Sequence, residues 1–118
     1  MEKNDTLLQA FEWYLPDDSQ HWNKLKVLAP SFSNLGVTLV WLPPAYKGAG
    51  GVHDVGYGVY DLYDLGEFDQ KGTIPTKYGT KQEYLDAIDA LQKENISVLA
   101  LLSLIHISEP TRQAEISY

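Results

Sequence analysis

The sequence predicts an α/β domain built on a parallel sheet. Three apolar stretches, 6–14, 37–42 and 96–100, have the length and residue types of buried strands. Two stretches with helical spacing, 22–35 and 80–94, lie between them. The order strand–helix–strand–helix–strand is typical of a parallel βαβαβ unit. This pattern fits a doubly wound sheet as well as a (β/α)8 barrel.

The first strand and helix are predicted from local pattern. The segment 6–14 (TLLQAFEWY) is apolar and aromatic, and Pro16 with two aspartates follows it, so we expect a mostly buried strand. Pro30 falls inside the helical stretch, where it predicts a kink or a first helix that ends near Ala29. Gly36 then closes the helix. The apolar stripe of this helix is formed by Trp22, Leu25, Leu28, Phe32 and Leu35.

The second strand, 37–42 (VTLVWL), is β-branched and ends at two prolines. The segment 45–79 that follows is rich in Gly, Tyr and Asp and has no sustained period. A connection of this length in a compact domain is usually functional, as a lid or a binding loop. Thr80 and Glu83 form a capping-box pattern that starts the second helix. A third strand begins at Ile96.

Composition limits the classes of function. The chain has 118 residues, a net charge of −7 and no cysteine. It therefore has no disulfide framework and no zinc–thiolate site. No Lys/Arg run is present, so we expect neither a nucleic-acid partner nor a membrane partner. The polar N-terminus has no apolar segment of a secretory signal, which favours a cytoplasmic protein.

Two motifs in the segment 45–79, a glycine cluster and a group of acidic residues, are assigned no functional role. The glycine cluster 48–51 precedes no helix and lacks a following Lys-Ser/Thr pair, so it indicates a flexible turn and not a phosphate-binding loop. Asp61, Asp64 and Glu67 suggest a pair of catalytic carboxylates. Acidic residues in such a loop are usually solvated or form turns, and we assign them no chemistry.

Four segments together resemble the opening third of the bacterial α-amylases, glycoside hydrolases that cleave α-1,4-glucans. They are QAFEWY, GVTLVWLPPAYKG, DVGYGVYDLYDLGEFDQKGT and TKYGTK, and they occur in order between Thr6 and Ala100. The resemblance implies that residues 1–100 are the N-terminal part of a catalytic (β/α)8 TIM barrel, incomplete here, with 45–79 as its long second loop. The active site of such a barrel lies at the carboxyl ends of the strands.

The resemblance also implies two substrate-binding residues. Tyr57 matches the family's tyrosine that stacks on the sugar next to the cleaved bond, and Trp13 is expected to line the cleft farther toward the non-reducing side. Aromatic platforms suit the flat apolar faces of sugars. Loop packing for Tyr57 and core packing for Trp13 remain the alternatives. Tyr60 and Tyr63 are expected to be structural.

Catalysis in this family uses a nucleophilic Asp, an acid/base Glu and a second Asp, and the resemblance puts all three on later strands. No catalytic and no metal-binding residue is therefore assigned in this chain. Calcium is expected in the full-length parent, with its ligands beyond Ala100.

The last residues depart from the family pattern. Residues 102–112 (LSLIHISEPTR) match the translation of a transposase adapter used in sequencing-library preparation, and a barcode-like segment and more adapter follow. We therefore interpret 101–118 as a non-native artefact tail. His106 coincides with a family active-site histidine only by position, because Ile105 stands where the family has a calcium-binding Asn.

The sequence thus predicts a fragment of an α-amylase that hydrolyses internal bonds of starch, glycogen and maltooligosaccharides with retention. The fragment alone is expected to be inactive. A maltooligosaccharide-forming hydrolase or an α-glucosidase on the same scaffold is the alternative. A non-catalytic glucan-binding module is disfavoured, because such modules are usually β-sandwiches and the element order here is βαβαβ.

Overall fold

The computed structural model describes residues 5–100. Three parallel strands form the central sheet, in the order β1 (Leu7–Gln9), β2 (Leu39–Leu42) and β5 (Ser97–Ala100). The register pairs Leu7 with Leu39 and Leu39 with Ser97. The predicted parallel βαβ order is confirmed, and the described part of the chain forms no closed barrel. The predicted artefact tail, 101–118, lies outside the described residues.

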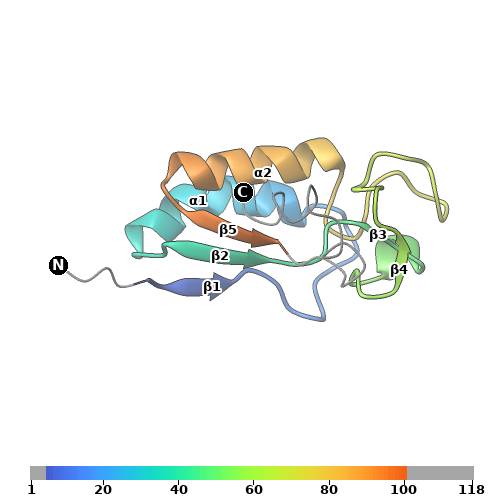
Figure 1. Ribbon diagram of the computed structural model, residues 1–118, viewed down its shortest axis with the longest axis horizontal. Helices are drawn as coiled ribbons and strands as arrows, with labels where there is room; N and C mark the ends of the chain where they lie inside the picture. Colours follow the sequence, from blue (N-terminus) through green and yellow to red (C-terminus); the bar gives the residue numbers. More distant parts are fainter. Residues whose placement is uncertain (1–4, 101–118) are drawn as a thin grey trace, which may run out of the picture.

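Two helices connect the strands and lie on the same side of the sheet (Figure 1). They are α1 (His21–Asn34) and α2 (Lys81–Lys93), and they pack against each other. The core lies between the helices and the sheet, where Val40, Leu42 and Val98 are buried. No helix within residues 5–100 is both long and apolar enough to cross a membrane.

Strand β1 is shorter and less buried than predicted. It ends at Gln9, and Leu7 is 53% exposed. Among the described strands it has a partner on one side only, and the helices cover one face of the sheet. The expectation of a mostly buried strand over 6–14 is therefore wrong. His21 Nε2 joins the end of this strand to α1 through a 2.5 Å hydrogen bond to the Ala10 carbonyl.

Helix α1 continues through Pro30, so the expected end near Ala29 is wrong. The proline lies in the last turn and a half of the helix, where the loss of one N–H donor is tolerated because Trp22, Leu25 and Ala29 anchor the preceding turns in the core. Gly36 ends the helix with φ of +85°, as predicted. Two residues of the predicted stripe, Leu28 and Leu35, are exposed instead of buried.

Helix α2 begins as its sequence predicts. The Thr80 hydroxyl accepts a hydrogen bond from the Glu83 N–H at 3.2 Å, and the Glu83 carboxylate accepts one from the Thr80 N–H at 2.9 Å. This reciprocal pair is the capping box. Tyr84, Ile88 and Leu91 then bury one face of the helix.

The segment 45–79 has structure of its own. A short antiparallel ribbon joins β3 (Lys47–Gly48) to β4 (Val59–Asp61), and a 3-10 turn, Gly51–His53, lies between them. This loop lies beyond the carboxyl ends of the parallel strands (Figure 1). Loops at that end of a parallel sheet are the usual place for a ligand site.

Candidate functional site

Trp13 and Tyr57 come together at the carboxyl end of the sheet. Their ring centroids are 6.4 Å apart and their planes differ by 5°. Both rings face solvent, with exposed fractions of 62% for Trp13 and 47% for Tyr57. Forty-four positions separate them in the sequence, so the fold creates this aromatic pair. A nearly parallel, exposed pair offers apolar faces to a flat ligand.

Asp54 shapes the backbone on both sides of Tyr57. Its Oδ1 accepts hydrogen bonds from the N–H groups of Gly56 at 2.8 Å and Gly58 at 3.3 Å, and its Oδ2 accepts one from Gly50 at 3.0 Å. No sequence pattern predicted a role for Asp54. An aspartate in a run of glycines is the signal that could have identified it, because aspartates bind backbone N–H groups in turns.

Glycine is required at position 56. Its φ is +110°, and a Cβ added there would lie 2.6 Å from the Cβ of Pro44. The loop therefore lies directly against the prolines that end β2. Tyr78 braces the same region, because its hydroxyl donates to the Val55 carbonyl at 2.7 Å while its ring packs on Trp22. Burial raises the pKa of the Tyr78 phenol above its ordinary value, so the hydroxyl stays a donor.

A hollow of about 350 Å³ opens beside Trp13. Its polar wall is an ion cluster in which the Asp17 carboxylate lies 2.7 Å from His53 Nδ1 and 2.5 Å from Lys77 Nζ. The hydrogen bond from His53, and to a smaller extent the one from Lys77, holds the pKa of Asp17 below its ordinary value. An aromatic face next to fixed charged groups can hold a polyhydroxylated ligand. His53, for which the sequence predicted no role, thus lines this hollow.

The acidic residues of the loop have structural partners. Asp61 accepts from the Tyr63 N–H at 2.9 Å, and Glu67 forms a 3.1 Å ion pair with Lys81. Asp64 is fully buried and accepts three backbone N–H groups. Of the two expected roles, solvated or turn-forming, Asp61 and Asp64 have the turn-forming one.

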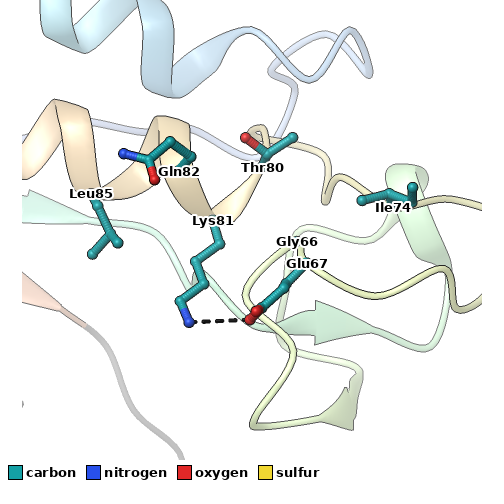
Figure 2. A pocket seen from close by; sticks show the side chains of 7 residues that line it. All are labelled: Gly66, Glu67, Ile74, Thr80, Lys81, Gln82 and Leu85. Atoms are coloured by element: carbon teal, nitrogen blue, oxygen red, sulfur yellow. Dashed lines mark hydrogen bonds and ion pairs between the residues drawn. The ribbon is translucent and has the colours of Figure 1, made fainter.

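A second hollow, of about 450 Å³, lies between the loop and the start of α2 (Figure 2). The Lys81–Glu67 ion pair crosses it. It has no aromatic wall and shares no lining residue with the hollow beside Trp13. It therefore lacks the stacking surface that a sugar site needs.

Tyr60 and Tyr63, predicted to be structural, lie on the loop surface with about half of each side chain exposed. The Lys71 ammonium sits 4.5 Å from the centre of the Tyr60 ring, a cation–π contact that ties two parts of the loop together. The structural role predicted for Tyr60 fits this contact.

Within residues 5–100, no group of three or more His, Asp or Glu side chains could hold a metal ion. The calcium that the family resemblance implies, with its ligands beyond Ala100, stays a prediction.

The chain is similar in sequence to curated bacterial amylases. It is 58% identical to the cytoplasmic alpha-amylase of Escherichia coli K12 over 97 residues, 82% of this chain, and 53% identical to the alpha-amylase of Bacillus licheniformis over 103 residues, 87% of this chain. This chain is a relative of the bacterial alpha-amylases. It is also 52% identical, over 103 residues, to the glucan 1,4-alpha-maltohexaosidase of Bacillus sp. strain 707.

The chain spans 20% of the length of each of these amylase relatives. No family model matches the chain. Among solved structures, it resembles truncated alternansucrase from Leuconostoc mesenteroides, with a TM-score of 0.68 and 30% identity over 81% of this chain and 10% of that one. The amylase relationship thus concerns a small part of much larger proteins.

Proposed function

We propose that residues 1–100 are the opening βαβαβ portion of the (β/α)8 barrel of an α-amylase. The full-length protein would hydrolyse internal α-1,4-glucosidic bonds of starch, glycogen and maltooligosaccharides with retention. Identity of 53–58% to two alpha-amylases over more than four-fifths of the chain is the observation that carries this proposal. Residues 101–118 would be a non-native tail, as the adapter match suggests.

The part played by this chain would be substrate binding. Trp13 and Tyr57 would stack on glucose rings, with Tyr57 at the sugar next to the cleaved bond. Their parallel, exposed rings at the carboxyl end of the sheet support this role. The Asp nucleophile, the acid/base Glu and the second Asp would come from later strands, as would any calcium ligands. A loop that holds its aromatic rings before substrate arrives lowers the cost of orienting the sugar.

We also propose a cytoplasmic location, which is supported by the 58% identity to an enzyme named a cytoplasmic alpha-amylase. Neither a nucleic acid nor a membrane is proposed as a partner, on the grounds of the net charge of −7 and the lack of basic runs.

The test is starch hydrolysis by the full-length protein, expressed from the uninterrupted source gene in a host without amylase. We expect reducing-sugar release with products of mixed length. The 118-residue chain is the matched control and should release nothing, because the family carboxylates needed for proton donation and glycosyl transfer are absent from it. Inactivity of the full-length protein, or activity of the short chain, would contradict the proposal.

A maltooligosaccharide-forming hydrolase is the second candidate, and the 52% identity to a maltohexaosidase favours it. The same assay separates the two. One dominant product length from the earliest time points would indicate the maltooligosaccharide-forming enzyme, whereas a broad distribution would indicate an endo-acting α-amylase.

A further inference from the structure

Lys47 is a charged residue with no exposure to solvent. Its ammonium nitrogen is enclosed by the segment 68–74, which has little regular secondary structure. The nitrogen donates to the carbonyl oxygens of Phe68 at 3.0 Å, Gln70 at 3.3 Å, Thr73 at 2.6 Å and Ile74 at 2.9 Å. A shell of carbonyl oxygens around a cation resembles the shells that proteins build around metal ions.

The carbonyl shell and the ammonium depend on each other. Buried carbonyl groups outside helices and sheets need donors, and the three N–H groups of the ammonium are shared among four of them. The carbonyls of Gln70 and Thr73 also accept a backbone N–H from each other's residue. A buried ammonium in turn is stable only when polar partners and an opposite charge replace its water. Removing the lysine would leave the Asp64 carboxylate and the surrounding carbonyl oxygens buried without their cation.

Asp64 supplies the opposite charge. Its Oδ2 lies 3.5 Å from the Lys47 nitrogen, and both side chains are fully buried. Its Oδ1 accepts the N–H groups of Gly66 at 3.0 Å, Glu67 at 2.8 Å and Phe68 at 3.2 Å. The pair therefore closes the turn at 64–68 and holds the segment 68–74 against β3.

The same contacts reach Tyr57 through the backbone. The Lys47 N–H donates to the Asp64 carbonyl at 2.7 Å, and Lys47 pairs with Asp61 across the ribbon of β3 and β4. The Ala49 N–H donates to the carbonyl of Gly58, the residue directly after Tyr57, at 2.5 Å. Strand β3 thus connects the buried cation to the backbone that presents the Tyr57 ring.

We propose that Lys47 is a positioning residue of the glucan site: a tethered cation that holds the loop so that Tyr57 lies beside Trp13. This inference rests on the proposed function. Lys47 touches no sugar and acts only through the loop. Its effect on catalysis is therefore predicted to pass through Tyr57, which distinguishes it from a residue that merely stabilises the whole fold.

The test uses the full-length protein with Lys47→Met, Tyr57→Ala and the double variant. Lys26→Met is the matched control, because Lys26 is an exposed lysine on α1, outside the loop. We expect Lys47→Met to lower kcat/KM on soluble starch by about tenfold or more, as for the loss of an aromatic stacking partner. In the Tyr57→Ala background the same substitution should change kcat/KM less than about twofold, since interacting residues are not additive. Lys26→Met should match the unmodified protein.

Hydrogen exchange supplies a readout that does not depend on activity. Lys47→Met should reduce protection of the amides of Gly66, Glu67 and Phe68 by roughly 100-fold, the effect expected when one partner of a buried ion pair is removed. If the unmodified protein does not act on starch, the proposed function fails, and this measurement still tests the loop. Unchanged protection, or losses of kcat/KM that multiply in the double variant, would overturn the inference.

If Lys47→Met does not fold, a second substitution tests the same inference. Asp64→Asn keeps the size of the side chain and the lysine but removes the opposite charge. We expect Asp64→Asn to lower kcat/KM less than Lys47→Met does. In the Tyr57→Ala background, Asp64→Asn should cause no further loss. A loss of equal size in both backgrounds would contradict the positioning role.

Discussion

The Tyr57 ring is presented by the backbone on either side of it. Asp54 accepts the N–H groups of Gly56 and Gly58, and these bonds fix the direction of the chain at Tyr57. The ring itself remains about half exposed beside Trp13. A rigid backbone with an exposed aromatic ring is the arrangement expected of a binding platform, because little entropy is lost when a sugar stacks on it.

Tyr57→Ala in the full-length protein should lower kcat/KM on soluble starch by about tenfold to a hundredfold. The reason is the loss of a stacking platform, worth roughly 1–3 kcal/mol by analogy with base–aromatic stacking. Tyr57→Phe keeps the ring face and should be much milder. Equal loss from both substitutions would indicate a hydrogen bond of the hydroxyl and would contradict the stacking account.

At the scale of elements, the sequence predicted those features of helices and strands that depend on residues close together in the chain. The capping box of Thr80 and Glu83 and the φ of Gly36 depend on neighbours in sequence, and both were predicted. The length of β1 depends on which faces of the sheet are covered, and the continuation of α1 through Pro30 depends on core packing. These long-range conditions leave little trace in a single sequence. The pairing of Trp13 with Tyr57 is predictable only through the family resemblance.

The start of α2 provides a stability prediction. Thr80→Ala removes the cap on the Glu83 N–H and should destabilise the full-length protein by about 1 kcal/mol. Thr80→Ser keeps the hydroxyl and is the matched control. Chemical denaturation monitored by far-UV circular dichroism measures both. A Thr80→Ala variant as stable as the serine variant would show that the cap contributes nothing.

The loop 45–79 should respond to acid through Asp64. Burial by itself would raise the pKa of this carboxyl group, but hydrogen bonds from three backbone N–H groups and from Gln70 outweigh it, and the pKa lies below its ordinary value of 3.8. A lowered pKa stabilises the fold at pH values above 3.8, and this contribution is lost as the pH falls through the lowered value.

The measurement compares melting temperatures of the full-length protein and its Asp64→Asn variant between pH 7 and pH 2. The unmodified protein should melt higher by a constant amount at and above about pH 5, and the gap should narrow only below the ordinary value of 3.8. A gap that closes already near pH 5, or one that persists unchanged to pH 2, would contradict the lowered pKa.

At the scale of the whole molecule, the helices within residues 5–100 cover one face of the sheet only. The helices bury Val40 and Val98, whereas Leu99 on the other face of the same sheet is 39% exposed and Leu7 is 53% exposed. The outer strands β1 and β5 each have a single partner among the described strands. Open edges and a partly exposed apolar face, on which Phe11 packs against Trp41, are features that a closed barrel would remove.

The 118-residue chain alone is therefore predicted not to fold stably. At low concentration in buffer it should give weak near-UV circular dichroism, bind a hydrophobic dye strongly and show no cooperative thermal transition. The full-length protein should behave in the opposite way in each measurement. A sharp melt with dispersed amide resonances from the short chain would show that this part of the barrel folds by itself.

The central claim is that residues 1–100 form the N-terminal part of the barrel of a larger amylase. In this chain, residues 101–118 would stand in place of the next part of that barrel. Sequencing the source genome across codon 101 tests it most directly. We predict an Asp at or next to position 101, followed within a few residues by an Asn-His pair, in one open reading frame with the preceding strand. A genome that encodes LSLIHISEPTR in frame after Ala100 would contradict the account.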